Sequence, residues 1–353
     1  MHDRRMNDDT ATAATTNTVR RALGPFSVGP VGLGCMNICH AYGQPLTETA
    51  ALALLQRALD LGVDHFDTAA LYGFGASERL VGRAIRGSRS RITLASKGGM
   101  AGVTGSDGVT RRVIDGRPEA IQRHCEDSLQ RLGTDVIDLY YLHRWDQAVP
   151  VEDSVGALAR LVEQGKVRAI GLSEVSAPTL RRAHAVHPIA AVQTEYSLWT
   201  RNPEIAVLQA CRDIGAAFVA FSPLARAFLT DTLHDPATLD DKDLRRAMPR
   251  FQPAAYAANL KLLPPYVAIA REAGCSPAQL ALAWLLAQGE HVHVIPGTSS
   301  TAHLADNLGA AAVRLTPDQV RRLDALINPR TVSGVRYTLA AQADVDTEDF
   351  APR

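Results

Sequence analysis

The chain of 353 residues alternates eight times between an apolar run of strand length and a stretch with the apolar spacing of a helix. Strands separated by helices pair in parallel, and eight strands exceed what a doubly wound sheet usually holds. The sequence therefore predicts a (β/α)8 barrel built as a single domain. The strand candidates are 30–34, 62–67, 92–96, 136–142, 167–173, 189–195, 216–222 and 291–297.

The two ends of the chain and two internal segments lack this alternation. Residues 1–20 are polar and rich in Asp, Thr and Ala, which predicts a disordered leader before a barrel domain at 21–330. Residues 331–353 are expected to form a C-terminal tail. Residues 98–116, rich in Gly, Thr and Ser, and the charged segment 223–253 are expected to be loops that shape or cover a site.

Charge balance and hydropathy exclude several classes of partner. Lys and Arg together number 37, as do Asp and Glu, so no net field attracts nucleic acid or an anionic membrane. No apolar stretch approaches the roughly 20 residues that cross a bilayer, and the N-terminus lacks the apolar core of a secretory signal. The five cysteines lack the spacing of a disulfide scaffold. We therefore expect a cytoplasmic protein that binds a small molecule and no metal.

Four polar residues stand where the second, third and fourth predicted strands end. Asp67 and Tyr72 follow the second strand, Lys97 the third and His143 the fourth. Parallel barrels bring such positions together at their C-terminal mouth, where barrel enzymes keep their chemistry. Taken alone, each residue type more often has a structural role. An Asp after a strand usually caps a helix or turn, a Lys is usually solvated, a Tyr at a strand end often packs in the core, and a buried His often only makes structural hydrogen bonds. Their joint placement is what predicts an active site.

Together these four side chains can polarise a carbonyl group. A Tyr side chain has an ordinary pKa of about 10, and Lys97 as an ammonium should lower the pKa of Tyr72 toward neutral pH. Asp67 would hold Lys97, and His143 would hydrogen-bond the carbonyl oxygen. Because no attacking nucleophile or metal cage accompanies them, the missing reagent is a hydride, and we infer a nicotinamide cofactor.

These residues lie in motifs that resemble the aldo-keto reductase superfamily from about Val19 to Tyr337. The motifs occur in family order, and they are FDTA followed by LYG, SKGG, LYYLHR, GLS, VQTEYS, FSPL and IPGTSS. The chain is most similar to a bacterial branch of the family, whose members carry a YSLW segment, here 196–199. They also carry a PAQLALAWLL helix, here 277–286.

The resemblance implies an aldehyde or ketone reductase whose catalytic residues are Asp67, Tyr72, Lys97 and His143. In the family, hydride passes reversibly from C4 of the nicotinamide to the carbonyl carbon, and Tyr72 is the implied proton donor. The implied cofactor-binding residues are Gly34, Cys35, Met36, Asp67, Ser173, Glu174, Gln193, Phe221, Ser222, Leu224, Arg226, Gly297, Thr298, Ser299, Ser300, His303 and Asn307.

Four of these positions depart from the family pattern. Phe221 replaces a frequent Tyr at the place of the ring that stacks on the nicotinamide. Glu174 replaces a frequent Asn, which removes one expected hydrogen bond to the carboxamide. Gly297 and His303 stand where strongly NADP-selective members have Lys and Arg, which weakens the charge pairing with a 2′-phosphate. We expect NADPH as the cofactor, with NADH as the alternative.

The substrate and a second class of function stay open at the level of sequence. The expected substrate-pocket residues are Met36, Tyr72, His143, Trp145 and Trp199. The alternative function is a nicotinamide-binding sensor or regulatory subunit with slow turnover, as in the potassium-channel β-subunits of the family. The residues do not choose among a sugar aldehyde, a pyridoxal, a ketosteroid-like ring and a small xenobiotic carbonyl. They do not set the oligomeric state either.

Overall fold

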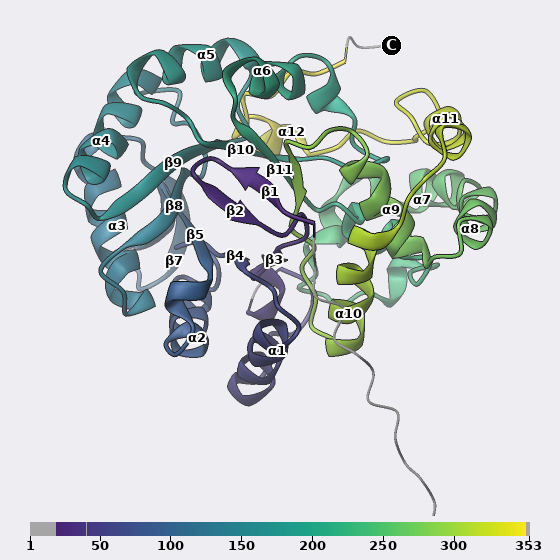
Figure 1. Cartoon of the computed structure of the whole chain (residues 1–353), viewed down its shortest axis with the longest axis horizontal. Helices are drawn as coiled ribbons and strands as arrows, with labels where there is room; N and C mark the ends of the chain where they lie inside the picture. Colours follow the sequence, from purple (N-terminus) through teal and green to yellow (C-terminus); the bar gives the residue numbers. More distant parts are fainter. Residues whose placement is uncertain (1–18, 40, 351–353) are drawn as a thin grey trace, which may run out of the picture.

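The computed structural model describes residues 19–39 and 41–350, and its centre is a closed barrel of eight parallel strands (Figure 1). Backbone hydrogen bonds join the first and last strands of the sheet, from Gly32 N to Val294 O (2.9 Å) and from Val294 N to Pro30 O (3.0 Å). A strand overlaps each of the eight predicted stretches, so the predicted barrel is confirmed. In sheet order the strands are β3 (Leu33–Gly34), β4 (His65–Asp67), β5 (Thr93–Gly98), β8 (Ile137–Leu142), β9 (Val167–Ser173), β10 (Ala191–Glu195), β11 (Ala217–Phe221) and β12 (Val292–Val294).

Helices surround this barrel, and local signals in the sequence set their ends. The hydroxyl of Thr47 accepts a hydrogen bond from Ala50 N at the start of α1, and Gly133, with φ of 63°, ends α3 in the left-handed conformation. The helices are α1 (Glu48–Asp60), α2 (Ala76–Ile85), α3 (Pro118–Leu132), α4 (Val151–Glu163), α5 (Ala177–Val186), α6 (Val207–Ile214), α7 (Pro253–Leu260), α8 (Leu263–Glu272), α9 (Pro277–Leu286), α10 (Thr301–Gly309), α11 (Pro317–Leu326) and α12 (Leu339–Gln342). Among the described residues, none of these helices is long and apolar enough to cross a membrane.

One helix differs from the sequence pattern. Residues 254–273 have continuous helical spacing, but the structure divides them into α7 and α8. Pro264 and Pro265 stand at the first turn of α8. Proline has no backbone N–H and cannot continue a helix from the preceding turn, so a new helix begins there.

A short antiparallel hairpin closes the bottom of the barrel. Its strands, β1 (Arg21–Leu23) and β2 (Phe26–Val28), lie across the barrel in Figure 1. Leu23 and Val28 are buried against the inward-facing side chains of the barrel. Residues 1–18 of the predicted leader lie outside the described residues, but Arg20 is described and forms an ion pair with Asp64.

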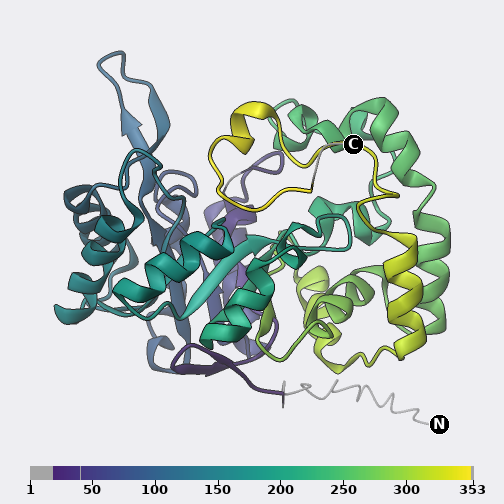
Figure 2. The ribbon, with the colours of Figure 1, turned by 90° about the horizontal axis from the view of Figure 1, so that it is seen from above.

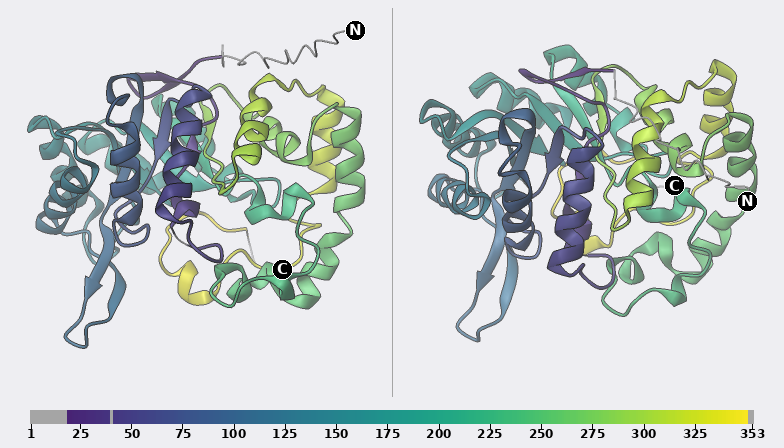
Figure 3. Two further views of the ribbon diagram at one scale, coloured as in Figure 1. Left: turned by 90° about the horizontal axis from the view of Figure 1, so that it is seen from below. Right: turned by 60° about the horizontal axis from the view of Figure 1, so that its bottom comes forward.

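A second hairpin corrects the expectation of a loop at 98–116. Strands β6 (Met100–Thr104) and β7 (Thr110–Ile114) pair antiparallel and project from the barrel (Figures 2 and 3). The turn between them contains Gly108 with φ of 74°. Only Met100 of these strand residues is buried, so the apolar alternation that marks a half-buried strand is weak.

The C-terminal tail and the segment 223–253 lie at the end of the barrel opposite the β1–β2 hairpin. Figure 2 shows the tail with α12 in yellow at the top and the purple β1–β2 hairpin at the bottom. The segment 223–253 contains only short 3-10 turns, the first of which is η4 (Ala225–Thr230). The C-terminal ends of the parallel strands are therefore covered by two irregular segments.

Candidate active site

Tyr72, Lys97 and Asp67 form a connected cluster at the C-terminal ends of β4 and β5. The ammonium of Lys97 donates to the Tyr72 hydroxyl (3.3 Å) and to Thr68 O (2.9 Å), and it forms an ion pair with Asp67. The second oxygen of Asp67 accepts from Gln193 Nε2 (2.7 Å). Because all three donors of the ammonium have acceptors, its position beneath the phenol is fixed.

His143 completes the cluster from the end of β8. Its backbone N donates to Gly98 O (2.8 Å), and its ring lies perpendicular to that of Tyr72, with 5.9 Å between centroids. Nδ1 is buried without a hydrogen-bond partner among the described residues. A buried lone pair costs less than a buried N–H without an acceptor, so the ring proton belongs on Nε2. The structure thus brings together the four residues that the sequence singled out.

Burial decides the protonation states of the cluster. Burial raises the pKa of Tyr72 above its ordinary value, and Lys97 opposes this only in part. The prediction that Lys97 lowers the pKa of Tyr72 toward neutral pH is therefore wrong in its net direction. Burial alone would lower the pKa of Lys97, but Asp67 and Tyr72 raise it above its usual value. Burial, with help from Arg144, lowers the pKa of His143 well below its ordinary value. At neutral pH the site holds a neutral phenol, an ammonium and a neutral imidazole.

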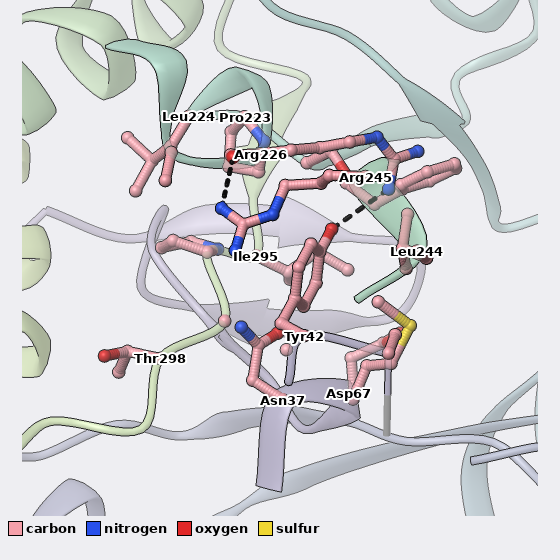
Figure 4. A pocket seen from close by; sticks show the side chains of 18 of the residues that line it. Asn37, Tyr42, Asp67, Pro223, Leu224, Arg226, Leu244, Arg245, Ile295 and Thr298 are labelled. Carbon is pink, nitrogen blue, oxygen red and sulfur yellow. Dashed lines mark hydrogen bonds between the residues drawn. The ribbon is translucent and has the colours of Figure 1, made fainter. Parts of the chain in front are cut away.

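The cluster opens into a cavity of about 780 Å³. Tyr72, Asp67 and His143 line one end, and residues that follow β12 line the other. The predicted loop 223–253 forms part of its wall, through residues such as Leu224 and Leu244. Figure 4 shows part of this lining.

Most of the predicted cofactor-binding residues line the same cavity. Gly34 ends β3, Met36 lies shortly after it, and Asp67 ends β4. The others come from β9 and β10, from the end of β11 and the residues after it, from the segment between β12 and α10, and from α10 itself. They are Ser173, Gln193, Phe221, Ser222, Leu224, Arg226, Gly297, Thr298, Ser299, His303 and Asn307.

Three predicted cofactor-binding residues lie outside the cavity lining. Cys35 is fully buried behind β3. Ser300 is the N-cap of α10, where its hydroxyl accepts from His303 N (3.4 Å). Glu174 is buried, and its carboxylate forms an ion pair with Arg336 (2.5 Å) in the C-terminal tail.

The two tryptophans expected in the substrate pocket also lie outside the cavity lining. The ring of Trp199 stacks on Phe228, with 4.1 Å between centroids, and contacts Phe251 edge-on. Trp145 donates its indole N–H to Val149 O (2.8 Å). Both rings are used for packing next to the barrel mouth, because aromatic neighbours and a backbone acceptor are available there.

The structure adds residues that the sequence pattern did not identify. Arg226 Nη1 donates to the Tyr42 hydroxyl (3.0 Å), and Arg245 Nη1 donates to Arg226 O (3.2 Å), as Figure 4 shows. The first contact holds the side chain of Arg226, and the second holds its backbone, which has a φ of 56°. Tyr337 of the tail and Arg144 also line the cavity. Only tertiary folding brings these side chains together, so no spacing in the sequence marks them.

The far end of the cavity has the features of an anion site. Thr298 and Ser299 line it, next to the N-terminus of α10. The first backbone N–H groups of a helix have no partner within the helix and favour negative charge. Gly297 permits a close approach here, because a Cβ at this position would lie 2.3 Å from Asn37 Oδ1.

Comparisons with known proteins identify the family of the chain. A model of the aldo/keto reductase family matches residues 30–328. The chain is 42% identical over 327 residues to "Probable aldo-keto reductase 1" of Glycine max, covering 92% of this chain and 93% of that protein.

Solved structures are similar over nearly the whole chain. The glycerol dehydrogenase AKR11B4 from Gluconobacter oxydans has a TM-score of 0.80 at 29% identity, with 91% of this chain and 97% of that one covered. An aldo/keto reductase from Klebsiella pneumoniae, in complex with NADP and acetate, has a TM-score of 0.68 at 28% identity. The match covers 92% of this chain and 99% of the Klebsiella pneumoniae chain.

Proposed function

The chain belongs to the aldo/keto reductase family, and on that premise we propose that it is an NADPH-dependent reductase of aldehydes or ketones in which Tyr72 supplies the proton. The family carries out NAD(P)H-dependent carbonyl reduction. The observation that carries the proposal is the contact of the buried Lys97 ammonium with both Asp67 and the Tyr72 hydroxyl. That arrangement serves to stabilise a phenolate after proton transfer.

The cavity fits a nicotinamide dinucleotide. It runs from Tyr72 to the segment before α10 and provides an aromatic wall at Phe221. Ser173 and Gln193 at the ends of β9 and β10 would hold the carboxamide, and the hydroxyls of Thr298 and Ser299 would hold the adenosine phosphate. When bound, the reduced nicotinamide supplies a hydride.

The residues of the chain provide the proton and the polarisation of the carbonyl group. The high pKa of Tyr72 keeps its hydroxyl protonated at neutral pH, ready to donate to the carbonyl oxygen. Lys97 stabilises the resulting phenolate, and Asp67 holds Lys97 in place. Neutral His143 would donate from Nε2 to the same oxygen and orient it. The reverse reaction, alcohol oxidation, uses the same groups with Tyr72 as the base.

The test is the loss of absorbance at 340 nm as NADPH is consumed with a panel of aldehydes and ketones. Tyr72→Phe should lower kcat by at least about 100-fold, since general acid catalysis contributes that much or more. Its affinity for NADPH, measured by fluorescence titration, should stay close to that of the wild type. Turnover at the wild-type rate in Tyr72→Phe would refute the role of this phenol.

A further inference from the structure

Four arginines line the cavity, and three of them are neutralised by a carboxylate. The three ion pairs are Arg112–Asp344, Arg226–Glu195 and Arg245–Asp243. The fourth, Arg144, forms no ion pair with any residue that the structure describes. A guanidinium keeps its charge at any physiological pH, so this part of the cavity carries an uncompensated positive charge.

The contacts of Arg144 leave one edge of its guanidinium open. Nη1 donates to His143 O (2.6 Å) and to Ser173 Oγ (3.1 Å), both of them neutral acceptors. Within residues 19–39 and 41–350, Nε and Nη2 make no hydrogen bond. The two bonds from Nη1 fix the plane of the group. The Nε–Nη2 edge of a guanidinium matches the two oxygens of a carboxylate.

Arg144 lies at the reacting end of the cavity. It directly follows His143, and its charge is one of the causes that lower the pKa of His143 and oppose the raised pKa of Tyr72. The proposed phosphate-binding residues, Thr298 and Ser299, lie at the other end, after β12. An anion that pairs with the open edge of Arg144 would therefore belong to the substrate and would not be a phosphate of the cofactor.

We propose that Arg144 is a specificity-determining residue that binds a carboxylate of the carbonyl substrate. The enzyme then prefers aldehydes or ketones with a carboxylate close to the carbonyl group over neutral compounds of the same shape. This inference rests on the proposed reductase function and adds a substrate class to it.

The experiment compares kcat/KM, with saturating NADPH, for 2-, 3- and 4-carboxybenzaldehyde and the matching carbamoylbenzaldehydes. The amides have the same shape without the charge, and the three isomers vary the distance between the carboxylate and the aldehyde. At least one isomer should be favoured over its amide by about 10- to 100-fold, the range of a hydrogen bond to a charged group.

Substitutions at Arg144 should act on this ratio. Arg144→Met should bring the ratio of carboxylate to amide close to one, whatever its effect on the absolute rates. Arg144→Lys, which keeps the charge without the planar fork, should keep part of the preference. The matched control is Arg112→Met, because Arg112 lines the same cavity but is already paired with Asp344. It should keep the wild-type ratio.

The outcomes separate this inference from the proposed function. Equal kcat/KM for carboxylates and amides in the wild type, or an unchanged preference in Arg144→Met, overturns the role of Arg144 while reduction itself stands. If no aldehyde is reduced, the proposed function fails, and calorimetry of benzoate and benzamide binding to the NADP-loaded protein then tests Arg144 alone. Weaker binding of benzoate but not of benzamide in Arg144→Met supports the inference, and equal binding to both proteins overturns it.

Discussion

Arg336 of the C-terminal tail forms a 2.5 Å ion pair with Glu174, and the exposed fractions of the two side chains are only 6% and 0%. Glu174 directly follows β9, and its carboxylate also accepts from Glu195 N (2.8 Å). The next tail residue, Tyr337, donates to Glu195 Oε2 (2.9 Å) and lines the cavity. A buried ion pair and a buried hydrogen bond thus hold the tail against the barrel mouth, beside the candidate active site.

Removing the cation of this pair should destabilise the protein. Arg336→Met leaves the Glu174 carboxylate buried without its partner, and we expect a loss of about 3–5 kcal/mol in the free energy of unfolding. Urea denaturation measures it. The double variant Arg336→Met, Glu174→Met should lose less than the single variant, because it leaves no unpaired buried charge. A single variant as stable as the wild type would contradict this account of the tail.

Lys97→Met should impair alcohol oxidation more than carbonyl reduction. Oxidation requires the Tyr72 phenolate, and without Lys97 the main interaction that offsets the burial is lost, so that only Arg144 still lowers the pKa of Tyr72. The pH profile of oxidation should therefore shift to higher pH than in the wild type. Rates in both directions, measured across pH with one alcohol and aldehyde pair, check this. Equal losses in both directions with no alkaline shift would show that Lys97 acts only structurally.

Acid should destabilise the protein through the buried His293. Burial lowers the pKa of His293 to about 4. Below pH 6.5 the unfolded chain takes up a proton that the folded protein does not take up until about pH 4. The free energy of unfolding therefore falls as the pH is lowered through this window, by roughly 3 kcal/mol from this group.

His293→Gln tests that contribution. Urea denaturation between pH 7 and pH 4 should show a weaker loss of stability than in the wild type. The control is His234→Gln, since the side chain of His234 is 65% exposed. The prediction would be contradicted if the free energy of unfolding fell as steeply with pH in His293→Gln as in His234→Gln.

His303→Arg should raise the preference for NADPH over NADH. His303 lines the end of the cavity proposed for the adenosine phosphate, and an arginine there adds a charge-assisted hydrogen bond to a 2′-phosphate. We expect the ratio of kcat/KM for NADPH to that for NADH to rise about 10-fold. Gly297→Lys should instead weaken both cofactors, since its Cβ would collide with Asn37. An unchanged ratio in His303→Arg would place the phosphate elsewhere.

Particular elements show why prediction succeeded or failed. The barrel strands are buried on both faces, so each is a continuous apolar run that is visible in the sequence. The β6–β7 hairpin is exposed and partly polar, so it was predicted as a loop. Trp199 stands close to the barrel mouth in sequence, but Phe228, on which its ring stacks, comes from another segment. The indole N–H of Trp145 is bonded within its own loop, to Val149 O, and no pattern in the sequence marks this contact.

The sequence by itself determined the barrel and the placing of Asp67, Tyr72, Lys97 and His143 at one mouth. Both follow from local periodicity and from the rule that parallel strands end on the same side. Only the tertiary structure decided which of these groups are charged, and which of the arginines in the cavity has a guanidinium edge without a hydrogen-bond partner in the described part of the chain. The pKa of Tyr72 depends on burial, and the open guanidinium of Arg144 depends on acids that pair with its neighbours instead. Burial and pairing arise between segments distant in the chain, so no pattern along it records them.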